Sequence, residues 1–79
     1  MIDGVKHNHS QVISRTAAIL KALQFFPDGV SIDALTSHVG LPRTTVEHLV
    51  SSLEQEALVI QSHRGIELGP ALLQMSRAA

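Results

Sequence analysis

The most constraining stretch of this chain is residues 31–53, SIDALTSHVGLPRTTVEHLVSSL, where apolar residues recur at helical spacing on both sides of a glycine. The spaced apolar positions are Leu35, Val39, Leu41, Val46 and Leu49. Gly40 interrupts the pattern, and glycine ends helices because it enters the left-handed backbone region without strain. The stretch therefore predicts a short helix, a tight turn and a second helix, which is the arrangement of a helix-turn-helix.

The residues at the ends of these two segments support the same interpretation. Ser31 is a suitable N-cap for a helix over about residues 32–38, and Asp33 lies in its first turn, where negative charge suits the helix dipole. Pro42 is expected at the first position of the second helix, because its missing N–H costs nothing there. That helix should run to about Glu56. Its inward positions are Val46, Leu49, Val50 and Leu53.

The segment before the motif predicts a third helix. Residues 1–9 are interpreted as a flexible lead-in, and Ser10 as the cap of a helix that runs to about Phe25. The apolar residues of this helix cover more than one narrow stripe. They form either one wide core face or a core face together with a part that meets a partner subunit.

The pattern changes after Ala57. Residues 58–60 and 65–68 read as two short strands around a turn at residues 62–65, and a helix-turn-helix followed by a hairpin is a winged helix. Gly69-Pro70 starts a final helix, whose apolar residues indicate one side of a contact with another chain. The expected fold is mainly α: a winged helix-turn-helix with a three-helix core and a two-stranded β wing, followed by the start of one more helix.

The second helix of such a motif leaves a polar face free, and that face fits the DNA major groove. Arg43 is the strongest candidate contact, since it stands at the head of this helix. Helix N-termini also favour phosphate. At the wing, Arg64 is a candidate phosphate or minor-groove contact. The other candidates on these elements are Thr44, Thr45, His48, Ser52 and His63, and Ser31 at the start of the first helix of the motif is one more.

Net charge argues against this interpretation. The chain has six Lys or Arg against seven Asp or Glu, which gives −1, whereas DNA affinity comes mainly from basic side chains that meet phosphate. Among the acidic residues, only Glu47 falls in the contact half of the second helix. A single domain should therefore bind DNA weakly on its own, and binding would require two copies of the domain in a dimer. The alternative is a winged helix that contacts another protein and has no role on DNA.

Composition narrows the remaining possibilities. A chain of 79 residues forms one small domain, and the absence of cysteine excludes disulfides and thiolate metal sites. No apolar run approaches the roughly 20 residues of a membrane helix. The first ten residues lack the apolar stretch of a signal peptide, which makes a cytoplasmic protein the expectation. His38, His48 and His63 have no ligand partners at metal-binding spacing, and no catalytic motif is present. We therefore expect no metal, no cofactor and no enzyme.

Three segments together carry a family resemblance: SRTAAILKAL, VSIDALTSHVGLPRTTVEHLVSSLEQEALV and GIELGPALLQM. They resemble the N-terminal domain of the IclR family of bacterial transcription regulators. The resemblance implies a homodimeric repressor or activator that binds a palindromic operator in double-stranded DNA. In the same resemblance, Arg15 matches an arginine of the family's first helix. The alternatives for Arg15 are contact with a backbone phosphate, contact with a partner subunit, or a plain surface role, which is favoured.

The same resemblance suggests an organisation of the chain. Residues 10–68 would form the DNA-binding domain, and residues 69–79 would begin a linker helix. In the family that helix continues into a domain that binds a small-molecule effector, which this chain lacks. The chain is therefore either a fragment of a longer protein or a stand-alone member of the family, and the apolar last helix favours a fragment. Two departures matter for DNA: the family usually has arginine in place of His48, and a non-acidic residue in place of Glu47. Thr36 stands where a small residue is usual.

Overall fold

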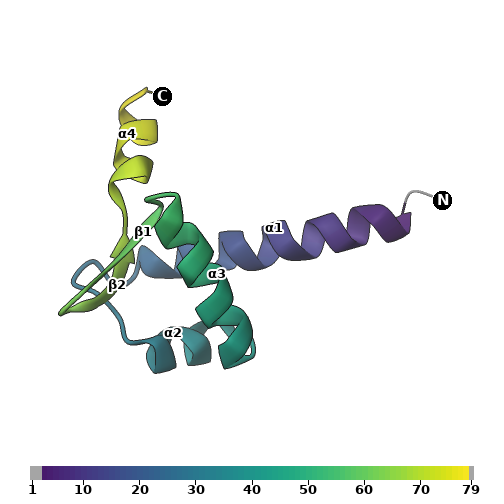
Figure 1. Cartoon of the computed structure of the whole chain (residues 1–79), viewed down its shortest axis with the longest axis horizontal. Coiled ribbons are helices and arrows are strands. Elements are labelled where there is room, and N and C mark those ends of the chain that lie inside the picture. Colours follow the sequence, from purple (N-terminus) through teal and green to yellow (C-terminus); the bar gives the residue numbers. More distant parts are fainter. Residues whose placement is uncertain (1–2, 79) are drawn as a thin grey trace.

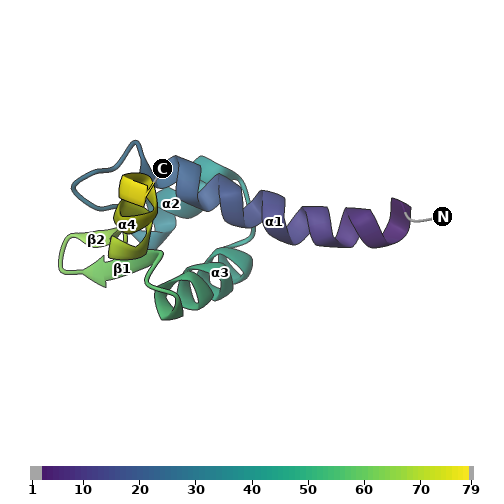
Figure 2. The same cartoon turned by 90° about the horizontal axis from the view of Figure 1, so that it is seen from above.

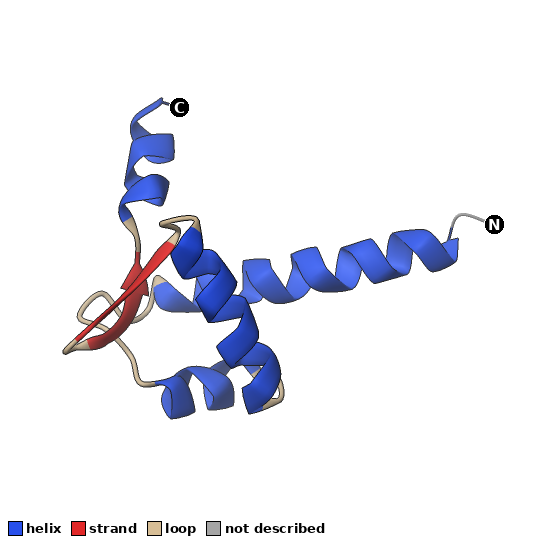
Figure 3. Cartoon of the chain, viewed as in Figure 1, coloured by secondary structure: helices blue, strands red, loops and turns tan. Residues whose placement is uncertain are grey.

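The structure, a computed structural model, describes residues 3–78, with side chains from residue 11 onward. Four helices and one hairpin follow in the order α1 (Asp3–Leu23), α2 (Ile32–Val39), α3 (Arg43–Gln55), β1 (Val59–Ser62), β2 (Gly65–Leu68) and α4 (Pro70–Ala78). Figure 1 shows α2 and α3 joined by a short turn, with α1 crossing behind α3. The hairpin lies at the left of this view, on the side away from the N-terminal end of α1. Figure 3 shows the same arrangement by type of element. The predicted winged helix-turn-helix is confirmed.

A small aliphatic core holds these elements together. Helix α1 packs on α2 and α3 and also reaches β2, while α3 packs against β1. Each element except α4 contributes buried side chains, because its apolar residues repeat with the period of the element. The buried residues are Ile19, Ala22, Leu23, Val30, Leu35, Val46, Val50, Leu53, Val59 and Ile66. This core fixes the outward direction of the remaining α3 side chains.

The turn between α2 and α3 is built as the sequence predicts. The Ser31 hydroxyl accepts a hydrogen bond from the Ala34 N–H at 3.1 Å, which caps α2. Gly40 has φ +70° and donates its N–H to the Thr36 carbonyl at 2.9 Å, which closes the helix in the left-handed conformation. One detail is corrected: Pro42 lies at the N-cap, and α3 begins at Arg43. The ψ of Pro42 is 142°, an extended value that keeps this residue outside the helix.

Thr36 offers a test of polar burial at this turn. Its Oγ1 is buried and has no hydrogen-bond partner within the described part of the chain. A buried hydroxyl without a partner loses its hydrogen bonds to water and gains none within the protein, which destabilises the fold. We expect Thr36→Val, which keeps the shape, to raise the free energy of unfolding by about 1 kcal/mol. Urea denaturation measures it.

Thr16 supplies the control for this substitution. Its hydroxyl donates to the Val12 carbonyl at 2.7 Å, so Thr16→Val removes a hydrogen bond that exists and should not stabilise. A lower free energy of unfolding in Thr36→Val than in the wild type would show that the Thr36 hydroxyl is satisfied in solution.

Helix α1 differs from its prediction at both ends. It begins at Asp3 and ends at Leu23, so Ser10 lies inside the helix and residues 3–9, assigned to the lead-in, continue it. Residues 5–9 contain no proline or glycine to stop helical hydrogen bonding. The N-terminal half of α1 extends beyond the rest of the fold (Figures 1 and 2). Val12 and Ile13 are 60% and 68% exposed there. The alternative in which all apolar residues of this helix form one wide core face is therefore wrong within a single copy of the chain.

Helix α4 also leaves the core. It starts after Gly69, whose N–H donates to the Leu58 carbonyl at 2.8 Å, and none of its residues is buried. Leu73 and Met75 are 61% and 58% exposed. Figure 1 shows α4 standing away from the three-helix core. Within residues 3–78, none of the helices combines the length and the apolar character needed to cross a bilayer.

The hairpin is antiparallel, and its register pairs Val59 with Leu68 and Ser62 with Gly65. The first strand, Val59–Ser62, begins one residue and ends two residues after the predicted range 58–60. A contact that the sequence analysis missed joins the hairpin to the loop between α1 and α2. Val30 and Ile66 exchange two backbone hydrogen bonds, at 3.1 and 2.8 Å. This bridge holds the wing against the body of the domain.

Candidate nucleic-acid interface

The outward side of α3 is the first part of the candidate surface. Because α3 buries Val46, Val50 and Leu53, the side chains between them face away from the core. Thr44, His48 and Ser52 are all exposed and follow one another at intervals of four residues. They therefore lie along one side of the helix. Thr45, beside this line, is only half exposed.

Arg43 begins this helix, and its guanidinium is held by two carboxylates. Its Nη1 lies 2.5 Å from Oδ1 of Asp33 on α2, and its Nε lies 3.1 Å from Oε2 of Glu47 on the next turn of α3. The Arg43 side chain remains 54% exposed. The arginine that the sequence singles out is thus accessible, and in the free chain it is also paired.

The wing tip carries the other candidate arginine. His63 and Arg64 form the turn between the strands and are exposed. Arg64 Nη2 donates to Glu67 Oε1 at 3.0 Å, and its Nη1 lies 3.9 Å from Asp28 Oδ1. The Ser62 hydroxyl donates to Glu67 at 2.8 Å and accepts the Arg64 backbone N–H at 3.1 Å. These contacts fix the shape of the turn.

Glu67 is the centre of that network, and its ionisation is favoured. The hydrogen bond from Ser62 lowers the pKa of the Glu67 carboxyl most; desolvation opposes this, and the charge of Arg64 reinforces it. A lowered folded-state pKa gives stability that is fully present above the ordinary glutamate value of about 4.3 and is lost as pH falls through the lower folded-state value.

We therefore expect Glu67→Gln to lower the free energy of unfolding at neutral pH, with a difference from the wild type that shrinks as the solution is acidified to about pH 3. Urea denaturation at several pH values measures both. A difference that stays the same down to that pH would show that the ionised form of Glu67 contributes nothing.

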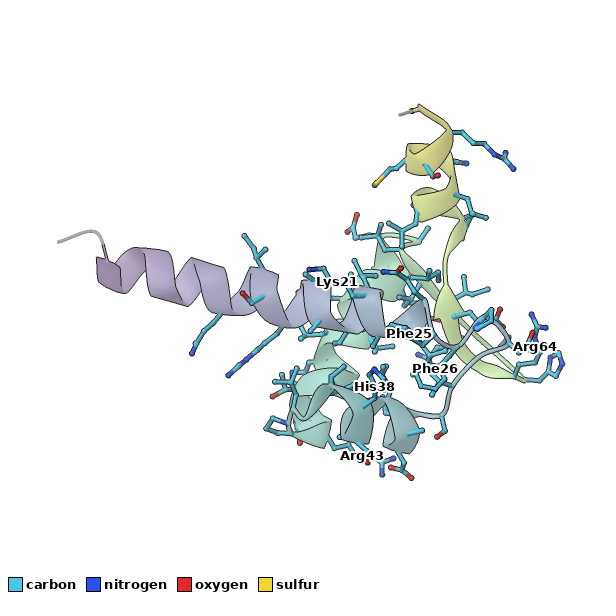
Figure 4. The ribbon with its side chains drawn as sticks, turned by 180° about the vertical axis from the view of Figure 1, so that it is seen from behind. Lys21, Phe25, Phe26, His38, Arg43 and Arg64 are labelled. Atoms are coloured by element: carbon cyan, nitrogen blue, oxygen red, sulfur yellow. The ribbon has the colours of Figure 1, made fainter. Side chains whose placement is uncertain are left out.

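Figure 4 places the two arginines at different ends of the surface: Arg43 beside the α2–α3 turn and Arg64 at the tip of the wing. The remaining candidates lie elsewhere. Ser31 uses its hydroxyl to cap α2, and Arg15 is half-buried on α1. Sequence reasoning missed three partners of the arginines, Asp33, Asp28 and Glu67. The fourth partner, Glu47, could have been predicted, because it lies one helical turn after Arg43 in the sequence.

The histidines do not gather into a metal site among the described residues. His38 instead contacts two aromatic rings, with centroids 5.9 Å from that of Phe25 and 5.4 Å from that of Phe26 (Figure 4). Such contacts are typical of a structural role. The side chains of His7 and His9 lie outside those that the structure describes.

Comparison with known proteins agrees with this geometry. The sequence model of the IclR helix-turn-helix domain family matches residues 12–63. This range is more than half of the chain and includes α2, α3 and the start of the wing turn. The chain belongs to the IclR family. IclR membership makes the α2–α3 pair the helix-turn-helix of a transcriptional regulator domain.

Two curated relatives support the IclR assignment. The HTH-type transcriptional regulator TtgV of Pseudomonas putida is 45% identical over 71 residues, 87% of this chain and 27% of TtgV. The HTH-type transcriptional regulator Rv1719 of Mycobacterium tuberculosis is 40% identical over 68 residues, 84% of this chain and 26% of Rv1719. The chain thus matches about a quarter of either regulator. Both relatives are named as regulators rather than enzymes, which supports a DNA-binding regulator domain.

Proposed function

We propose that this chain is a sequence-specific DNA-binding domain of an IclR-like transcriptional regulator. Residues 42–52 lie in the major groove, and the turn at residues 62–65 contacts the adjacent backbone. The observation that carries the proposal is the exposed polar side of α3, with Thr44, His48 and Ser52 in line and Arg43 at its head. Thr45 and His63 complete the contacts, and Arg15 reaches a phosphate or a partner subunit.

The proposal includes binding as a homodimer to an inverted repeat. One domain with a net charge of −1 attracts DNA weakly, and two copies double the contacts. Two-fold symmetry would place the α3 helices of the dimer about 34–36 Å apart, one turn of DNA. The exposed apolar residues Val12 and Ile13 on α1, and Leu73 and Met75 on α4, are available to a second copy. An effector would act through a domain beyond this chain.

A gel-shift titration across salt concentrations tests the proposal. The probe is a duplex enriched by the chain from a randomised pool, compared with a shuffled duplex of the same composition. We expect tighter binding to the enriched duplex, and affinity that falls steeply with salt because phosphate contacts release counterions. Sedimentation with the duplex gives the stoichiometry. Equal affinity for both duplexes, or no dependence on salt, contradicts the proposal.

A second candidate function is contact with another protein instead of DNA. The observation that favours it is the pairing of both candidate arginines with carboxylates, which reduces their attraction for phosphate. The same titration separates the two functions, because a domain used only for protein contact would enrich no sequence from the pool.

A further inference from the structure

The ion pairs of Arg43 bear on how α3, the helix proposed to lie in the major groove, distinguishes a base from a phosphate. One guanidinium faces the carboxylates of Asp33 and Glu47, so this cluster carries more negative than positive charge. All three side chains are exposed, at 54% for Arg43, 75% for Asp33 and 49% for Glu47. Anything that approaches the head of α3 therefore meets the carboxylates together with the arginine.

We propose that Asp33 and Glu47, called the carboxylate pair below, are specificity-determining residues. They hold Arg43 away from DNA phosphate and leave it available to the neutral acceptors of a guanine. This inference rests on the proposed function and adds a role for two acidic residues.

The geometry of the guanidinium supports this role. Arginine has five N–H donors, and the carboxylate pair occupies only Nη1 and Nε. Neither bond reaches Nη2, so the end of the guanidinium keeps donors for a second partner. Guanine presents O6 and N7, two neutral acceptors side by side in the major groove, which suit two such donors.

A phosphate is treated differently by the same cluster. To pair with Arg43 it must come close to two carboxylates of its own charge, and the repulsion acts on every DNA sequence alike. A guanine edge carries no net charge and meets much less of this repulsion. The carboxylate pair should therefore weaken non-specific binding more than it weakens binding at a site with a guanine in register.

The position of Asp33 makes the orientation specific. It comes from α2, while Arg43 and Glu47 come from α3, so the guanidinium is held from two helices. The capped start of α2 fixes Asp33 in its first turn, two residues after Ser31. Arg43 is thus oriented before DNA arrives, and contact with a guanine through the remaining donors does not require either ion pair to break.

The test uses the full chain and a duplex of mixed sequence, with Asp33→Asn and Glu47→Gln as variants. Each variant should bind this duplex about fivefold more tightly at low salt, the effect of about one exposed ion pair. Arg43 then becomes a phosphate contact, so the slope of log K against log salt should steepen by about 0.9. Selection from a randomised pool should give a weaker guanine preference than the wild type gives.

Glu56→Gln is the matched control, because Glu56 lies at the far end of α3 and the substitution removes the same charge. Thermal melting establishes that each variant is folded. A salt slope that changes in none of the variants, or changes equally in Glu56→Gln, overturns the role of the carboxylate pair while the proposed function stands. No salt-dependent binding by the wild type or by either variant overturns both.

Discussion

Gly65→Ala is expected to lower the free energy of unfolding by about 3 kcal/mol or more, whereas Gly40→Ala should lower it by about 1 kcal/mol. Both glycines have positive φ, +112° at Gly65 and +70° at Gly40, so both substitutions strain the backbone. Only at Gly65 does the added Cβ also meet the body of the domain, 2.5 Å from the Val30 carbonyl oxygen and 2.8 Å from its carbon.

The collision at Gly65 falls on the bridge that holds the wing. Val30 and Ile66 exchange their backbone hydrogen bonds beside it, and Ile66 is part of the core. Since backbone atoms cannot turn aside as a flexible side chain does, either the wing separates from the loop or Ile66 leaves its place. Around Gly40 nothing lies within 4 Å of a Cβ, so only the backbone strain remains.

Urea denaturation of the two variants measures the difference. Amide hydrogen exchange adds a local readout, because the Val30 and Ile66 amides should lose protection in Gly65→Ala and keep it in Gly40→Ala. Equal destabilisation by the two substitutions would show that the bridge to the wing contributes little to stability.

The contrast between these glycines also explains what the sequence could predict. Gly40 lies inside a local pattern, and its role follows from the residues just before and after it. The helix-turn-helix boundaries were therefore predicted almost to the residue. The role of Gly65 depends on Val30, far away along the chain, and no local pattern indicates that approach.

The same distinction applies to the candidate site. Exposure of Arg43, Thr44 and His48 follows from the period of α3, which the sequence displays. The partners of the arginines depend on tertiary packing, because Asp33 belongs to another helix and Asp28 to a loop. The start of α1 was misplaced for a different reason: Ser10 is a good cap residue, but it also sits within a helix when nothing breaks the chain before it.

Arg43→Ala should weaken binding to the enriched duplex by about 1–3 kcal/mol if Arg43 reads a base in the proposed manner. The loss should be largest for duplexes that keep the preferred guanine and small for the shuffled duplex. Arg77→Ala, which removes an exposed arginine from the last turn of α4, is the control. Fluorescence anisotropy at constant salt measures the affinities of the wild type and of both variants for the two duplexes. Unchanged affinity in Arg43→Ala rejects this residue as a reader.

Combining Arg43→Ala with Asp33→Asn separates the two effects that the carboxylate would have. Repulsion between Asp33 and phosphate does not need the arginine, so part of the gain in affinity for mixed sequence should persist in the double variant. The steeper salt slope needs a guanidinium that is free to meet phosphate, so it should vanish when Arg43 is absent. A slope that steepens equally in both backgrounds would mean that Asp33 acts on DNA by its charge alone.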